Sequence, residues 1–241
     1  MNTSTLTGST RLSAVVLAGL LTASLAACGS NDDSTGADAA STAAPTTAAA
    51  TPAAPSAAPS PKVLAMLDKI SGGSTTVTLD PTFVKGLTAL KLTPGVVGQT
   101  KLTKAGALVF PITGGSATLY EQGTTGTDPF IVGVVEHDGQ GITLTGGGKT
   151  VTLKNFDVDA GKSEIRTDIS VGKKAFGSDV PTFIADGSTL KYPPTMEGKN
   201  AILEGTEVKL TAGAAEALNT VFGTDALKEG FPVGVAKIAV H

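Results

Sequence analysis

Short alternations of apolar and polar residues, separated by glycine-rich turns, dominate residues 62–241 and limit the fold more than any other feature of the chain. Apolar residues at every second position lie on one face of a strand. Turn sequences such as Gly146-Gly-Gly148 between two such runs are typical of hairpins. The sequence therefore predicts a mainly β domain, an antiparallel sandwich or barrel. The alternating runs are Val77/Leu79, Leu108/Phe110/Ile112, Ile142/Leu144, Val151/Leu153 and Ile165/Thr167/Ile169/Val171.

Two short helices interrupt this pattern. The first is expected after Asp80-Pro81, because aspartate caps helix N-termini and proline fits the first helical position. Thr211 caps the second in the same way. We also expect a helical lead-in over residues 63–70.

The surroundings of the two helices resemble each other. Val77-Thr-Leu79 matches Val208-Lys-Leu210 at an offset of 131 residues, and the segment 97–102 matches 233–238. This indicates a strand–helix–strand unit repeated at the two ends of the domain, with the terminal strands paired. The alternative is chance recurrence in a biased composition.

The N-terminal segment is typical of an export signal. The apolar run at 13–27 is shorter than the ~20 residues that span a bilayer. It ends in Leu25-Ala-Ala-Cys28, which resembles the lipobox of bacterial lipoproteins. We therefore predict a signal peptide over 1–27 and acylation of Cys28, including palmitate-type chains. The protein would then be anchored to the cell membrane and face its extracytoplasmic side.

Residues 29–61 connect this anchor to the domain. They contain Ala, Thr, Ser and five prolines but no large apolar side chain, so they are predicted to form a disordered stalk. At ~3.1 Å per residue, such a segment extends up to roughly 100 Å. The sequence thus divides into a signal peptide (1–27), a lipidated stalk (28–61) and one domain (62–241).

Few residues in the domain are suited to catalysis or metal binding. The net charge of −3 is incompatible with a nucleic-acid footprint, and the chain's one cysteine is Cys28. Of the two histidines, His241 is C-terminal. His137 is expected at a strand end, on the same face as Ile131 and Val135 and before an Asp138-Gly139 turn. We predict no metal site and no catalytic residue.

One stretch of the domain resembles exported actinobacterial domains of the HtaA type. The matching segments are 110–115 (Phe-Pro-Ile-Thr-Gly-Gly), 134–139 (Val-Val-Glu-His-Asp-Gly) and 141–159. The resemblance implies a β domain that binds haem at the cell surface, with a tyrosine as axial ligand and a supporting histidine. His137 lies in a matching segment. The family's tyrosine-bearing segment has no counterpart, since residues 76–90 contain neither Tyr nor Trp, which leaves Tyr120 and Tyr192 as candidates.

The leading hypothesis is a non-enzymatic binding or interaction module of the cell envelope, with haem as its ligand through His137, Tyr120 and Tyr192. A second hypothesis is a structural protein that packs against cell-wall components and has no small-molecule site. A third is an extracytoplasmic hydrolase, which would need paired carboxylates such as Glu197 and Glu204, or Glu121 and Asp128.

Overall fold

A computed structural model describes residues 61–122 and 130–241. The predicted signal peptide, Cys28, nearly all of the stalk and Asp128 lie outside these residues. One continuous antiparallel sheet forms the described part, with two helices. This confirms the predicted class, and the sheet is not closed into a barrel. Its strands are β1 (Val63–Leu67), β2 (Gly73–Leu79), β3 (Thr93–Val97), β4 (Lys101–Leu102), β5 (Ala107–Pro111), β6 (Gly114–Tyr120), β7 (Ile131–Gly146), β8 (Lys149–Asp159), β9 (Glu164–Val171), β10 (Lys174–Asp186), β11 (Lys191–Glu197), β12 (Asn200–Leu210) and β13 (Pro232–Val240).

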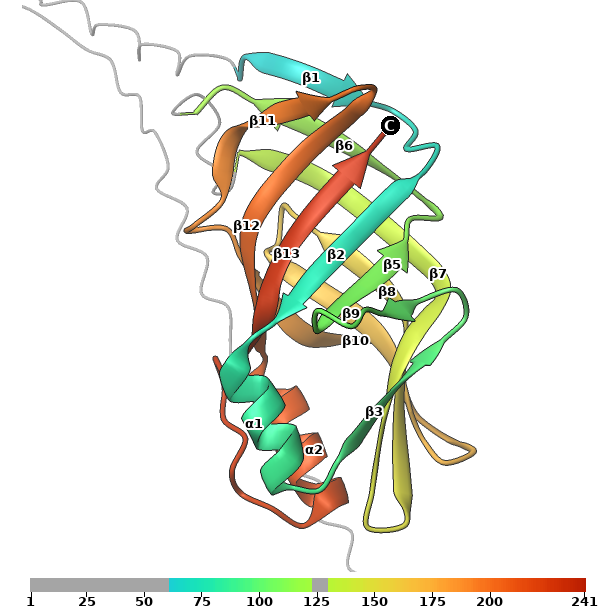
Figure 1. The fold of residues 1–241 in the computed structure, drawn as a ribbon. Coiled ribbons are helices and arrows are strands. Elements are labelled where there is room, and N and C mark those ends of the chain that lie inside the picture. Colours follow the sequence, from blue (N-terminus) through green and yellow to red (C-terminus); the bar gives the residue numbers. More distant parts are fainter. Residues whose placement is uncertain (1–60, 123–129) are drawn as a thin grey trace, which may run out of the picture. The chain divides into compact units, whose positions relative to one another are not determined.

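The order of the strands brings the two ends of the domain together. It runs β1-β6-β7-β8-β9-β10-β12-β13-β2-β5-β4, with β11 paired to β12 and β3 paired to β7. The last strand, β13, therefore lies between β12 and the early strand β2 (Figure 1). This is the terminal pairing that the sequence predicts. It covers the edges of β2 and β13, which would otherwise be open to other chains.

The lead-in segment is a strand, so the expectation of a helix at 63–70 is wrong. β1 pairs antiparallel with β6, matching Val63 with Tyr120 and Leu67 with Ala117. The apolar residues of 63–67 are compatible with a helix or a strand. Strand preference depends on tertiary context, and here the free edge of β6 is available for pairing, so the segment forms a strand.

Both predicted helices form, and each begins directly after its expected N-cap residue. α1 spans Pro81–Ala89, and the Asp80 carboxylate accepts a hydrogen bond of 2.6 Å from the Thr82 amide. α2 spans Ala212–Phe222, and the Thr211 hydroxyl accepts one of 3.2 Å from the Ala214 amide. Gly223 ends α2 in the left-handed region at φ 67°.

The expected repeat is present in part. β2–α1 and β12–α2 are both strand–helix units, and Leu87 and Leu218 are buried at equivalent helical positions. The strands that follow differ, because β3 pairs with β7 whereas β13 pairs with β12 and β2.

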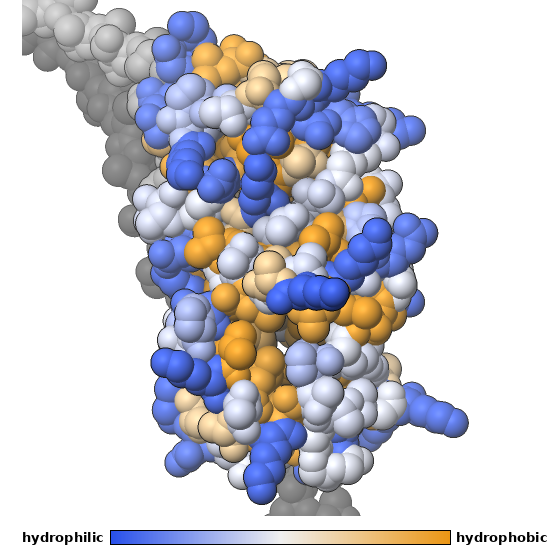
Figure 2. Space-filling view, in the orientation of Figure 1, coloured by the Kyte–Doolittle hydropathy of each residue, from blue (hydrophilic) through white to orange (hydrophobic). Residues whose placement is uncertain are grey.

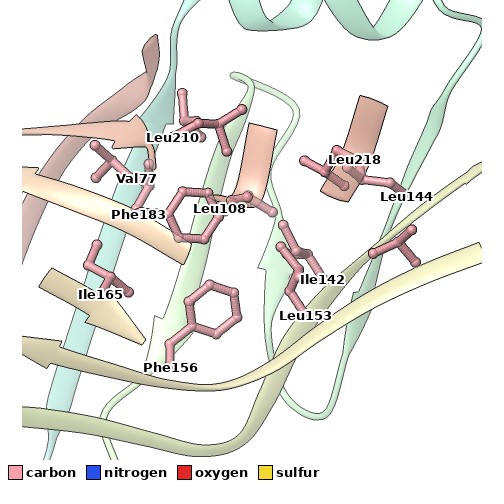
Figure 3. Packing of buried hydrophobic residues seen from close by; sticks show 14 of the residues in the cluster. Val77, Leu108, Ile142, Leu144, Leu153, Phe156, Ile165, Phe183, Leu210 and Leu218 are labelled. Carbon is pink, nitrogen blue, oxygen red and sulfur yellow. The ribbon is translucent and has the colours of Figure 1, made fainter. Parts of the chain in front are cut away.

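The interior contains two apolar clusters. The larger, which we call the aromatic cluster, is built around Phe110, Phe156 and Phe183, with Phe156 and Phe183 stacked at 6.1 Å, and it continues beneath the helices to Leu218 (Figure 3). The smaller, which we call the aliphatic cluster, contains no buried phenylalanine. Its buried members are Ile70, Ile112, Ala117, Leu119, Ile131, Leu203, Ile238 and Val240.

Apolar side chains also reach the surface. Figure 2 shows them between the charged side chains that project from one face of the domain. Large apolar residues that are exposed include Val84 in α1, Val235 in β13, Met196 in β11 and Phe176 in β10.

Candidate functional site

An apolar cavity lies within the aliphatic cluster. It lies between β6 and β7 on one side and β12 and β13 on the other, and Leu67 and Ile70 contribute to its wall. Thr206 is the one polar side chain in this wall. The wall consists of Leu67, Ile70, Ala117, Leu119, Ile131, Gly133, Val135, Val158, Ala160, Ala185, Leu190, Ala201, Leu203, Thr206, Ile238 and Val240.

The cavity exists because small residues occupy positions that a larger side chain would fill. Ala117, Ala160, Ala185, Ala201 and Gly133 all belong to the wall. Aromatic residues make up only 4% of the chain, and those that are fully buried lie in the aromatic cluster. The remaining volume is about 60 Å³. Apolar cavities of this kind stay dry, and one of about 150 Å³ holds benzene.

The structure brings Tyr120 and Tyr192 together beside this cavity. The Tyr192 hydroxyl donates a hydrogen bond to the Tyr120 backbone carbonyl, and its ring lies 6.2 Å from that of Phe130. Tyr192 packs against the aliphatic cluster as a partly buried residue. Burial raises the pKa of the Tyr192 phenol above its ordinary value.

His137 lies elsewhere, in the interior between β7 and β2. It is 1% exposed, and its ring meets that of Phe110 edge-on at 6.1 Å. Nδ1 lies 3.0 Å from the Phe156 carbonyl oxygen and Nε2 lies 2.8 Å from the Thr75 hydroxyl. Because a carbonyl can only accept, Nδ1 carries the proton and Nε2 accepts from Thr75. Both ring nitrogens are thus engaged.

The surroundings of His137 differ from the expectation in one respect. Ile131 and Val135 do share its face, as the alternation predicts: Ile131 and His137 are buried, and Ile131 and Val135 line the cavity. However, Asp138-Gly139 does not end the strand, because β7 continues through a bulge between His137 and Gly141. The bulge adds residues without reversing the chain, so His137 lies in mid-strand and is buried.

A second, smaller cavity adjoins the His137 ring. It measures about 50 Å³ and is lined by Thr75, Phe110, Phe156 and other core residues. Val158 belongs to the walls of both cavities. The interior of the sheet therefore holds unfilled apolar volume in both clusters.

The carboxylates proposed as a hydrolytic pair are engaged separately. Glu197 binds Lys237 and Glu204 binds Lys191, each at 3.0 Å. Burial and the neighbouring Glu136 raise the pKa of Asp157, but this group is on the outer side of the sheet, opposite the buried Phe156 and Val158. In the described residues no three His, Cys, Asp or Glu side chains gather in a way that holds a metal ion.

The sequence named Tyr120 and Tyr192 as candidate ligand residues, and it did not point to the cavity residues. Ala117 and Leu119 alternate in β6, as do Ala201 and Leu203 in β12. Alternation assigns such residues to the core, but only the pairing of distant strands reveals that the small ones face one another.

No known family profile matches the chain, and no curated protein does. Two solved structures of the kind that the sequence resembles are similar to it. The C-terminal domain of HtaA from Corynebacterium glutamicum is 13% identical, with a TM-score of 0.47, over 73% of this chain and 98% of that one. The heme binding protein HtaB from the same organism is 13% identical, with a TM-score of 0.49, over 71% of this chain and 93% of that one. At this similarity neither structure indicates what this chain binds.

The described part of the chain contains no helix with the length and apolar character needed to cross a bilayer.

The buried position of His137 predicts a pH dependence of stability. Desolvation lowers its pKa from the ordinary value of 6.5, so the unfolded chain binds a proton more readily than the folded one. The stabilisation is complete above about pH 6.5 and is lost progressively below it, toward the folded pKa. We expect the free energy of unfolding in urea to decrease between pH 7.5 and pH 5, and this decrease to be smaller in His137→Gln.

An NMR titration tests the same point without a variant. The ring signals of His137 should titrate with a midpoint below pH 6.5, with His241 giving the second histidine signal. A His137 signal that titrates at or above pH 6.5 would contradict the assignment of a buried, neutral ring.

Proposed function

We propose that this domain is a non-enzymatic binding module whose ligand is apolar and enters the cavity of the aliphatic cluster. The observation that carries the proposal is the cavity wall, in which Thr206 is the one polar side chain. Such a wall holds a ligand by excluding water and offers no group for acid–base or nucleophilic chemistry. It favours a binding module over a structural protein without a small-molecule site.

The size of the cavity indicates the shape of the ligand. About 60 Å³ is less than half of the roughly 150 Å³ that accommodates a benzene ring. A slender alkyl chain end fits such a volume better than a ring system. Each methylene that it buries contributes about 0.8 kcal/mol. We therefore propose an aliphatic chain, of the kind found in lipids, as the ligand class.

Haem is the second candidate, since the sequence resembles HtaA-type domains and one similar structure is described as a heme binding protein. As they stand, two of its three candidate ligands are engaged elsewhere. Haem iron is held by His, Tyr, Cys or Met side chains, but both nitrogens of His137 are engaged and the Tyr192 hydroxyl is bound to the Tyr120 backbone carbonyl. Neither tyrosine belongs to the cavity wall.

We also propose that the chain is a lipoprotein held at the cell membrane through Cys28. This rests on the sequence that precedes the cysteine and on the stalk that follows it. Two or three acyl chains on one residue anchor a protein stably, where one chain is marginal.

Binding of cis-parinaric acid, a linear fluorescent fatty acid, tests the cavity. The chain from residue 28, made without acylation as Cys28→Ser, should enhance the fluorescence of the probe in a saturable way. Ala201→Leu fills the cavity from β12 and should weaken binding about tenfold, since its added carbons replace those of the ligand.

Ala217→Leu is the matched control. Ala217 is also a half-buried alanine beside an apolar hollow, but that hollow lies under α2. This variant should bind the probe like the parent chain. Absence of saturable binding, or equal weakening by both substitutions, would contradict the assignment of the ligand to the cavity.

A hemin titration distinguishes the two ligand classes. We expect no Soret change that depends on His137, Tyr120 or Tyr192, because the ligand atoms of His137 and Tyr192 are engaged and neither tyrosine lines the cavity. A Soret shift in the parent chain that disappears in Tyr192→Phe or Tyr120→Phe would favour haem over an aliphatic ligand.

The anchor is tested in the cells that produce the protein. Cys28→Ala should release the protein to the medium or leave unprocessed precursor, whereas the parent chain should partition with the membrane and incorporate labelled palmitate. An unlabelled parent chain would rule out acylation.

A further inference from the structure

We propose that the tip of the β9–β10 hairpin is a docking surface for an anionic lipid membrane. Lys173 and Lys174 form this tip together with Phe176, which is 61% exposed. An aromatic ring flanked by lysines suits the boundary of a bilayer, where the ring reaches the acyl region and the ammonium groups meet the head groups. This proposal does not depend on the cavity or on its ligand.

The two lysines are available for a partner. Among the described residues, neither makes an ion pair or a side-chain hydrogen bond, and both are exposed. Other lysines of the domain are engaged, for example Lys191 with Glu204 and Lys237 with Glu197. The tip therefore presents uncompensated positive charge on a domain from a chain whose net charge is −3.

Acidic groups on the same hairpin are neutralised or turned to other partners. Asp179 binds Arg166 at 2.7 Å. Asp168 accepts hydrogen bonds from the Ser178 hydroxyl and the Asn155 amide, and these contacts lower its pKa. Both lie behind the tip, on the strands, so they leave the charge of Lys173 and Lys174 at the end of the hairpin.

The hairpin is supported on one side by its neighbour. The Gly172 amide donates to the Thr150 carbonyl at 2.8 Å, which joins the tip to the β7–β8 hairpin, and both tips lie at the end of the domain that carries the helices (Figure 1). The Lys149 ammonium donates to the Val221 carbonyl at the end of α2. The tip of the hairpin is therefore fixed by hydrogen bonds. Docking on a membrane then costs little conformational entropy.

Phe176 also adjoins the apolar hollow beneath α2, which Ala217 and Val221 line. If covering this hollow were its whole role, Phe176 would be largely buried, yet the residue is 61% exposed. A soluble polyanion would gain from the lysines but nothing from the ring. A lipid surface gains from both, which is why we favour it over an anionic wall polymer.

The chain contains no tryptophan, so one introduced at the tip reports on its surroundings alone. In the unacylated Cys28→Ser chain, Phe176→Trp should give a blue shift of emission with vesicles of phosphatidylglycerol and phosphatidylcholine. It should give none with phosphatidylcholine alone. Adding Lys173→Glu and Lys174→Glu should weaken binding roughly 25-fold or more at low salt, at about fivefold for each lysine lost.

Met196→Trp is the matched control. Met196 is 65% exposed and lies near another hairpin turn with a lysine, Lys199, between β11 and β12. This variant should show no shift, and thermal unfolding of both variants shows whether they fold. A lack of any shift, or an equal shift in both variants, would overturn the proposal. Equal binding to heparin and to anionic vesicles, without a blue shift, would identify the partner as a polymer and overturn it as well.

Discussion

A buried histidine links two parts of the sheet across the interior of the domain. β7 and β2 are far apart in the order of the strands, and no ladder of backbone hydrogen bonds joins them. His137 connects them through Thr75 and connects β7 to its neighbour through the Phe156 carbonyl. A sheet that does not close on itself needs such side-chain contacts across its interior. The ring is desolvated to make them, which is why its pKa falls.

The His137 contacts also lie between the two apolar clusters, each of which keeps some unfilled volume. Phe110, Phe156 and Phe183 surround the region near the histidine, and the two helices extend it. Beyond Val135, the interior is lined by leucine, isoleucine, valine and alanine, and a cavity remains. A chain with so few aromatic residues cannot fill the interior of a large curved sheet evenly. The cavity is therefore a consequence of composition, and its position between β6–β7 and β12–β13 follows from where the alanines lie.

The parts of the fold that depend on local chemistry were predictable from the sequence. Asp80 and Thr211 cap the helices as expected, and Gly146–Gly148 turns between β7 and β8. The parts that depend on distant partners were not. Residues 63–67 form a strand because β6 offers an edge, and His137 is buried because Thr75, 62 positions away, bonds to its ring. Tyr192 meets the Tyr120 carbonyl across 72 positions, so both tyrosines could be named but their hydrogen bond could not.

The central claim is that the cavity of the aliphatic cluster takes an aliphatic ligand. Methyl-selective NMR of the unacylated chain, recorded during a titration with dodecanoate, tests it most directly. The account predicts shifts for the methyl groups of Leu119, Leu203 and Ile238, which line the cavity. Those of Leu153, Leu210 and Leu218, in the aromatic cluster, should stay in place. Shifts of equal size in both clusters, or none in the first, would contradict it.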